Sequence, residues 1–315
     1  MEARLQRRVQ RYGWDLAACD YERLWQAQLG PAQADLLARV ALRAGERVVD
    51  VACGTGLVSF AAAEAVGATG RVLGVDISGA MVEAAQRLAD ARAVGHAAFA
   101  RMDAEALDLA DAGFDAALCA LGLMYVPDPA RAVRELCRVV RPGGRIGVAV
   151  WGERSRCGWA AVFPIVDAEV ASEVCPLFFG LGSGDALLRI CADAGLVEIE
   201  PRRIATTLVY DDGEEACDAA FVGGPVALAW SRFDLSTRER VRAHYLAAIS
   251  SWRQPDGGYR IPGEFVVVVA LRADSADRAR ADSADRSSVD SADRSRADRA
   301  GDASAAGSDR PDHAA

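Results

Sequence analysis

Short apolar runs rich in β-branched residues alternate with stretches of helical spacing through the first half of the chain. The short runs have the length of strands and are bounded by Gly, Pro or Asp. They lie at residues 47–51, 71–76, 96–103, 114–121 and 145–151. Helical stretches separate most of them, at 57–66, 79–93 and 127–140. This alternation predicts βαβ crossovers, and therefore an α/β protein with a parallel sheet covered by helices on both faces.

The pattern is looser beyond Trp151. Residues 152–182 combine aromatic side chains with Pro and Gly. Further elements are predicted as helices at 183–195, 213–222 and 236–252 and as strands at 196–209 and 264–272. The last of these contains four consecutive Val residues, which is typical of a central strand buried on both faces.

The composition changes abruptly after Arg272. The unit SADR recurs three times at a spacing of eight, and residues 273–315 hold ten Asp and seven Arg but only one aliphatic side chain larger than Ala. Burial of so little apolar surface does not offset the entropy of ordering the chain. We therefore expect a disordered tail, with a partner-binding or tethering segment as the alternative, and a single folded domain over residues 1–272.

The charge balance is acidic, with 45 Asp and Glu against 36 basic residues and a net charge of −9. Such a surface does not attract a phosphate backbone, so no nucleic-acid partner is expected. All the basic residues are Arg, because Lys does not occur. A lysine Schiff base and a P-loop lysine are therefore excluded.

Neither a membrane span nor a secretory signal is expected. The longest apolar runs, 116–126 and 265–271, fall short of the roughly 20 residues that a membrane helix needs, and the N-terminus lacks the apolar stretch of a signal peptide. The eight Cys residues form no C-x-x-C pair and are typical of reduced, buried cysteines in a cytoplasmic protein. The alternative is a metal or metalloid site that uses Cys157, Cys175 or Cys217.

A glycine-rich loop, ACGTG, follows the first strand and precedes a helix. Such a loop alone is a weak signal, because several nucleotide-containing ligands bind there. A dinucleotide fingerprint would place a third glycine at position 59, which is Ser, and Asp50 at the strand end would repel a pyrophosphate. These features favour a cationic ligand over NAD, with Gly54 and Gly56 allowing the backbone to approach it closely.

Two further acidic residues end the next two strands. Asp76 lies 20 residues after Gly56, where a carboxylate that accepts both ribose hydroxyls is expected. Asp103 ends the third strand and could accept from an adenine amino group, with the backbone N–H of Ala104 reaching the ring. The alternatives are that Asp76 starts a turn and that Asp103 caps a helix or turn.

Several segments occur together in a familiar order: VVDVACGTG, GVDIS, RMDAEAL and a long stretch from FDAALCAL to GVAVW. In these segments the chain resembles the class I S-adenosylmethionine-dependent methyltransferases. More narrowly, it is similar to the small-molecule group that includes the ubiquinone/menaquinone C-methyltransferases. The match covers residues 10–151, whereas 152–272 share only the architecture. One departure is Ala52, where the family usually has the first glycine of the loop.

The resemblance implies a Rossmann-like seven-stranded sheet of order 3-2-1-4-5-7-6 with the last strand antiparallel, and S-adenosyl-L-methionine as cofactor. It divides the domain into an N-terminal helical lid (1–45), a cofactor-binding core (46–151) and a substrate-side region with the C-terminal strands (152–272). It implies a cofactor site made of Asp50, Ala52, Cys53, Gly54, Gly56, Asp76, Ile77, Met81, Asp103, Ala104 and Leu121.

The acceptor side carries fewer signals. No cluster with metal-ligand spacing is visible, so no metal is expected and a mechanism that needs bound Mg²⁺ is disfavoured. Tyr21, in the lid, and His244, on an amphipathic helix, are the candidate catalytic groups, although both fit structural roles. Aromatic residues at 151–182 could line an apolar pocket.

The sequence therefore predicts a methyltransferase that acts on a small, apolar organic acceptor. The other hypotheses are an NAD-dependent oxidoreductase, a non-catalytic protein that binds S-adenosylmethionine, and a metalloid methyltransferase that uses cysteines. The oligomeric state has no signature in the sequence.

Overall fold

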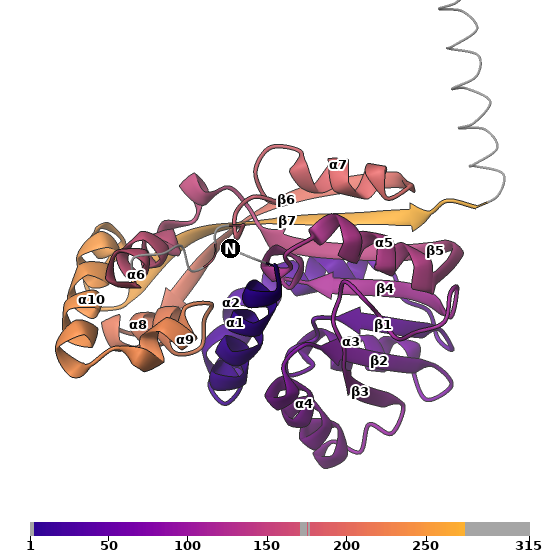
Figure 1. The fold of residues 1–315 in the computed structure, drawn as a ribbon, viewed down its shortest axis with the longest axis horizontal. Coiled ribbons are helices and arrows are strands. Elements are labelled where there is room, and N and C mark those ends of the chain that lie inside the picture. The colour runs from indigo at the N-terminus through magenta and orange to yellow at the C-terminus, as the bar shows by residue number, and fades with distance from the viewer. Residues whose placement is uncertain (1–2, 171–174, 176, 275–315) are drawn as a thin grey trace, which may run out of the picture. The chain divides into compact units, whose positions relative to one another are not determined.

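The computed structural model describes residues 3–170, 175 and 177–274. Its centre is a seven-stranded sheet of order β3-β2-β1-β4-β5-β7-β6, seen in Figure 1. The strands are β1 (Arg47–Val51), β2 (Arg71–Asp76), β3 (Ala97–Arg101), β4 (Phe114–Ala120), β5 (Val140–Trp151), β6 (Leu196–Tyr210) and β7 (Tyr259–Arg272). The first five strands run parallel, and β7 is antiparallel to both of its neighbours. The predicted fold class, including the strand order, is confirmed.

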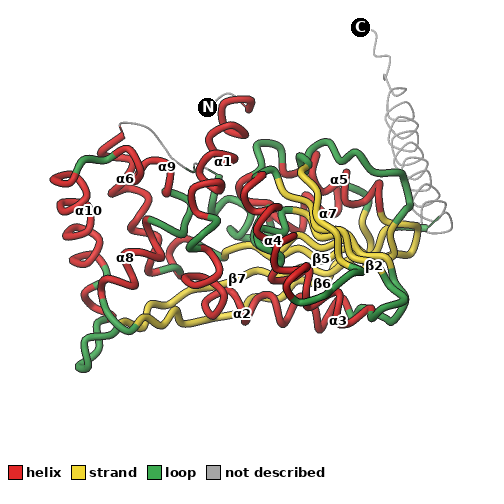
Figure 2. Tube along the Cα trace, turned by 90° about the horizontal axis from the view of Figure 1, so that it is seen from below, coloured by secondary structure: helices red, strands yellow, loops and turns green. Residues whose placement is uncertain are grey.

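Helices cover both faces of the sheet, as the alternating pattern predicted. On one face α2 (Tyr21–Val40) packs against α3 (Leu57–Val66), and on the other α5 (Pro129–Val139) packs against α7 (Ala186–Asp193); Figure 2 shows these two layers. The helix α4 (Gly79–Ala91) lies against β2 and β3. Burial of apolar side chains between these layers and the strands is the main source of stability.

The N-terminal segment consists of two helices with different environments. The second, α2, packs along β4, β5, β6 and β7 and buries Leu29, Leu36 and Val40, so it belongs to the core. The first, α1 (Ala3–Ala17), contacts α4 and α9 (Ala227–Arg232) instead of the sheet. Of these two helices, only α1 therefore lies where the predicted lid would be.

The two C-terminal strands extend beyond the rest of the sheet. The strand β7 begins at Tyr259, five residues before the predicted start, and pairs with β6 as far as Tyr210. The helices α6 (Val162–Val170), α8 (Gly213–Phe221), α9 and α10 (Leu235–Ala248) gather around this extension (Figure 1). A stacked pair of rings, Phe221 and Trp230, lies among them with centroids 4.7 Å apart.

Element boundaries differ from the predictions mainly at chain reversals. The RPGG segment ends α5 as expected, but β5 already begins at Val140, because the chain turns directly from the helix into the strand. Residues 1–272 form one compact unit. In the described part of the chain, no helix is long and apolar enough to cross a membrane. The tail predicted to be disordered begins at residue 273; Ala273 is buried, and residues 275–315 lie outside the described residues.

Candidate functional site

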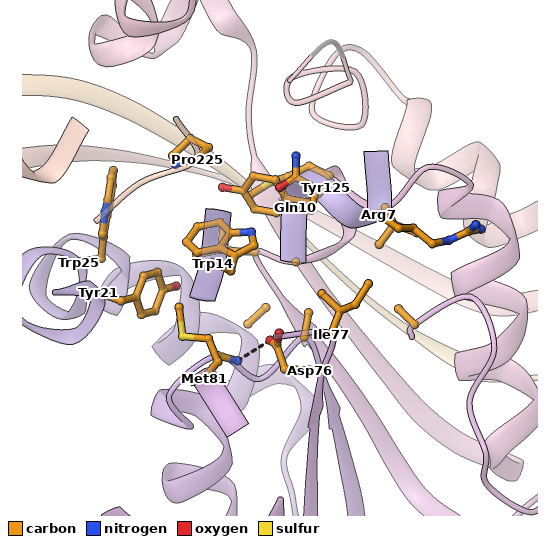
Figure 3. A pocket seen from close by; sticks show the side chains of 18 of the residues that line it. Arg7, Gln10, Trp14, Tyr21, Trp25, Asp76, Ile77, Met81, Tyr125 and Pro225 are labelled. Atoms are coloured by element: carbon orange, nitrogen blue, oxygen red, sulfur yellow. Dashed lines mark hydrogen bonds between the residues drawn. The ribbon is translucent and has the colours of Figure 1, made fainter. Parts of the chain in front are cut away.

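A pocket opens at the carboxyl ends of the parallel strands, the usual place for a ligand in an open α/β sheet. Its empty space amounts to about 960 Å³ with the open mouth included, at the upper end of the range for small-molecule sites. Its walls come from the ends of β2, β4 and β5, from the loops after β1 and β3, and from α1 and α2, as Figure 3 shows in close-up. Of the predicted site residues, it is lined by Tyr21, Ala52, Gly54, Asp76, Ile77, Met81, Asp103, Ala104 and Leu121.

The glycine loop turns sharply beneath this pocket. Ala52, Gly54 and Gly56 all have positive φ, at 59°, 56° and 92°. This conformation favours glycine, which explains why a glycine is usual at position 52 and shows that Ala is accommodated there. A side chain at Gly56 would meet the ring of Phe60 at 2.9 Å. The loop therefore presents backbone to the pocket, with no bulky side chain of its own in the way.

The Asp76 carboxylate lies at the centre of the pocket floor. It is 8% exposed, and its two oxygens accept the backbone N–H groups of Gly54 and Ser78, each at 2.9 Å. Burial raises the pKa of this carboxyl, and the hydrogen bonds oppose the rise. These two bonds fix its orientation and leave lone pairs available to a ligand.

Asp50 lies behind the glycine loop and does not line the pocket. It is 1% exposed and accepts a 2.6 Å hydrogen bond from the Ser59 hydroxyl. Burial raises its pKa to about 7. The Ser at the position of a third glycine is thus a partner of Asp50. Two other predicted residues, Cys53 and Gly56, also support the loop from outside the lining.

An ion pair joins α1 to the third acidic strand end. The Arg7 guanidinium lies 3.1 Å from the Asp103 carboxylate and 2.5 Å from that of Glu105. Glu105 is buried and also accepts the N–H of Asp128. Sequence reasoning missed Arg7 and Glu105, because nothing in their local pattern indicates a contact across 98 residues.

A second contact holds the end of α1 against the start of α4. One carboxylate oxygen of Asp15 accepts the Ser78 hydroxyl at 2.6 Å and the Ala80 N–H at 3.2 Å. The Ser78 oxygen in turn accepts the N–H of Met81 and caps α4. Through these contacts α1 covers the turn that follows Asp76.

Aromatic rings line much of the pocket wall. These are Trp14, Tyr21, Trp25, Tyr125, Trp151 and Trp159. The Trp151 and Trp159 centroids are 4.8 Å apart, and those of Trp14 and Tyr125 are 5.0 Å apart. Burial raises the pKa of Tyr21, and the neighbouring charges of Asp76 and Asp50 raise it further. The Tyr21 phenol therefore remains protonated near neutral pH and is available as a hydrogen-bond donor.

The remaining candidate catalytic and metal-binding residues do not line the pocket. His244 is exposed on α10 and does not line the pocket. Cys157 and Cys217 are buried, and Cys175 is half-buried. Over residues 3–170, 175 and 177–274, no group of three or more His, Cys, Asp or Glu side chains is placed to hold a metal ion.

Comparison with known proteins identifies a methyltransferase domain in this chain. A methyltransferase-domain family matches residues 48–144. The ubiquinone/menaquinone biosynthesis C-methyltransferase UbiE of Francisella philomiragia is 33% identical over 133 residues, which are 42% of this chain and 50% of that protein. The chain thus spans about half the length of the curated relatives it matches.

Solved structures share the fold at low sequence identity. The YcgJ protein of Bacillus subtilis is 16% identical with a TM-score of 0.56, over 78% of this chain and 100% of that one. Phosphoethanolamine N-methyltransferase 2 of Haemonchus contortus, solved with S-adenosyl-L-methionine, is 15% identical with a TM-score of 0.53, over 82% of this chain and 57% of that one. The match to the methyltransferase domain over residues 48–144, the identity to the C-methyltransferases and the observed strand order together support a class I S-adenosylmethionine-dependent methyltransferase.

Proposed function

We propose that this protein transfers a methyl group from S-adenosylmethionine to a small organic acceptor. The observation that carries the proposal is one pocket with two kinds of lining. The Asp76 carboxylate, at the end of β2, and the glycine loop line its floor, whereas aromatic rings line much of its wall. A polar cofactor and an apolar acceptor can therefore meet in it.

The residues present fit the cofactor. Asp76 would hold the ribose hydroxyls, because its carboxylate is oriented by Gly54 and Ser78 and faces the pocket. Ile77, Asp103 and Ala104 would receive the adenine. The loop from Ala52 to Gly56, with Met81 and Leu121 nearby, would surround the methionine part.

Asp50 would act from behind the loop. A cationic ligand next to the glycine turn would favour the ionised form of this carboxyl, whereas a pyrophosphate would be repelled by it. Since Ser59 both replaces the third glycine of a dinucleotide fingerprint and donates to Asp50, an NAD-dependent oxidoreductase is not favoured.

The chemistry makes few demands on the protein. When bound, S-adenosylmethionine supplies a methyl group already activated by a sulfonium centre. The pocket residues have to align the acceptor with it and exclude water. The aromatic wall provides the dry surface, and α1, held by Arg7 and Asp15, covers the opening. The protonated Tyr21 can donate a hydrogen bond that orients an acceptor oxygen.

The positions of the cysteines also bear on the metalloid alternative and on the location of the protein. A metalloid methyltransferase is not favoured, because Cys157, Cys175 and Cys217 are not gathered in the pocket. A cytoplasmic location is part of the proposal, supported by eight cysteines that are all present as thiols rather than disulfides.

The test is methyl transfer itself. The full chain is incubated with methyl-labelled S-adenosylmethionine and small-molecule extracts, and products are sought by label and by a mass increase of about 14 Da. Transfer to a product of low molecular mass is expected. Binding of the cofactor without transfer to any extract component would instead favour the non-catalytic alternative.

A further inference from the structure

The outer side of α1 carries an exposed apolar stripe. Leu5, Tyr12 and Leu16 are 40%, 47% and 50% exposed, and the half-buried Val9 lies between the first two. These four residues follow one another at spacings of four, three and four, so they share one face of the helix. Six large apolar side chains in the described part of the chain are exposed to this degree, and three of them belong to this helix. Exposed apolar patches of this kind mark interaction surfaces.

The opposite side of α1 packs on the protein itself. Arg7, Gln10 and Trp14 line the pocket, and Figure 3 shows these three side chains around it. The Gln10 amide also donates to the sulfur of Cys175 at 3.6 Å. Figure 2 shows α1 at the surface, with its N-terminal end projecting from the folded unit. The stripe therefore takes no part in holding the helix in place.

Arginine residues lie beside the stripe, all on the same side of it. They are Arg4, Arg8 and Arg11. In the part of the chain that the structure describes, the exposed guanidinium groups of Arg4 and Arg8 form no ion pair, and that of Arg11 lies over the Tyr12 ring. The acidic residue of this helix, Asp15, already accepts two hydrogen bonds from the start of α4. The surface thus combines apolar side chains with available positive charge.

This combination restricts the partner. A second copy of α1 laid on the stripe would add its own arginine residues and no free carboxylate, so like charges would meet. The C-terminal tail has one aliphatic side chain larger than Ala and cannot cover the stripe. A bilayer with anionic lipid offers both an apolar interior and phosphate groups. The net charge of −9 opposes this only weakly, because charges beyond about 8 Å are largely screened at physiological salt.

We propose that α1 docks the protein on the surface of a membrane that contains anionic lipid. Leu5, Tyr12 and Leu16 would enter the boundary between headgroups and acyl chains, and Arg4 and Arg8 would contact lipid phosphates. The helix lies in the interface and does not span it. This inference goes beyond the proposed function and does not depend on it. Under that function, the pocket that α1 covers would open beside a phase in which an apolar acceptor dissolves.

The experiment measures binding of the full chain to vesicles of two compositions by cosedimentation. One is phosphatidylcholine alone, and the other is an equimolar mixture of phosphatidylcholine and phosphatidylglycerol. We expect the mixed vesicles to bind about tenfold or more tightly than the neutral ones, because the arginine residues gain phosphate partners. Added salt should weaken binding to the mixed vesicles.

Two double variants separate the apolar and the charged contributions. Leu5→Gln with Leu16→Gln should weaken binding to the mixed vesicles about tenfold, because less apolar surface enters the bilayer. Arg4→Gln with Arg8→Gln should weaken it by about the same factor and leave binding to neutral vesicles unchanged. None of these four side chains lines the pocket.

Val209→Gln with Arg260→Gln is the matched control. These two residues are exposed and lie opposite each other on β6 and β7, so the control removes one apolar and one basic side chain from another surface. It should bind both kinds of vesicle as the unaltered chain does.

Several outcomes would overturn the proposal. These are no binding to the mixed vesicles, equal binding to both compositions, and α1 variants that bind as the unaltered chain does. Dimerisation that is lost with Leu5→Gln and Leu16→Gln, without vesicle binding, would assign the stripe to a second copy instead. The comparison of vesicles on the unaltered chain needs no variant, so a poorly folded variant does not remove the test. The assay contains neither cofactor nor acceptor, so its result is independent of methyl transfer.

Discussion

At the scale of single residues, the carboxyl group of Asp50 is set apart by its burial. It is 1% exposed and is hydrogen-bonded to Ser59, and burial raises its pKa from 3.8 to about 7. Between these two values the unfolded chain releases the Asp50 proton while the native protein keeps it. Native stability therefore decreases as the pH rises through this window.

Replacing Asp50 with Asn should remove this dependence while retaining an acceptor for the Ser59 hydroxyl. The rise of the pKa corresponds to about 4 kcal/mol. The free energy of unfolding of Asp50→Asn, relative to that of the unaltered chain, should thus increase by up to that amount from pH 4 to pH 7.5. Urea denaturation at several pH values measures it. The exposed Asp90→Asn serves as control, and parallel pH curves for the Asp50 variant and the unaltered chain would refute the assignment.

Some residues of the site could be predicted from the sequence, and others could not. Asp76 and Asp103 were predictable, because strand ends in a parallel sheet meet at one edge and the local pattern marks the strand ends. Asp50 was predicted at the cofactor site; the structure places it behind the loop, where it accepts a hydrogen bond from Ser59. Tyr125 went unpredicted, because its place in the wall depends on packing against α1.

At the scale of elements, α1 is the part of the site with the least support from the core. Its contacts are with α4 and α9 rather than the sheet. Polar bonds hold it at both ends, through Arg7 near its start and Asp15 near its end. We expect these bonds to govern how long a ligand remains enclosed.

Removal of the Asp15 carboxylate by Asp15→Ala should loosen the end of α1, because two hydrogen bonds to the α4 turn are lost. The dissociation rate of S-adenosylhomocysteine should increase about tenfold, as measured by stopped-flow displacement. Asp20→Ala is the control, since that carboxylate pairs with Arg23 one turn further along the chain. Equal dissociation rates for the Asp15 variant and the unaltered chain would show that α1 does not act as a cover.

Most elements were predictable from periodicity, since a helix and a strand bury different sets of positions. The packing of α2 on the sheet could not be predicted in this way. Its sequence has little helical amphipathicity and contains Pro31, and it was grouped with the lid. The helix nevertheless packs on four strands of the sheet. Burial on a sheet is set by the neighbouring elements, which a local pattern does not reveal.

At the scale of the whole molecule, we expect the compact unit and the acidic tail to be separable. Residues 1–272 form one unit by their contacts. The strand order was predictable only through the family resemblance, because periodicity does not determine which strands pair. The long β6–β7 extension and its helices were not foreseen as a unit, since the segment from 152 to 258 lacks a regular pattern.

A chain that ends at Asp274 should therefore keep both stability and ligand binding. The melting temperature is expected within about 2 °C of the full chain, because the segment removed has almost no apolar surface to bury. The affinity for S-adenosylhomocysteine should be unchanged. Differential scanning calorimetry and titration calorimetry measure these two quantities. A large loss of either would assign the tail to the folded unit.

The central claim is that this pocket binds S-adenosylmethionine through Asp76, and a calorimetric titration of the full chain with S-adenosylhomocysteine tests it most directly. We expect one molecule bound per chain and no binding of NADH. Asp76→Ala should weaken binding about 100-fold or more, because two hydrogen bonds to a charged group are lost, whereas Asp90→Ala should bind normally. Binding of NADH in place of S-adenosylhomocysteine, or unchanged affinity in Asp76→Ala with its fold intact, would contradict the account.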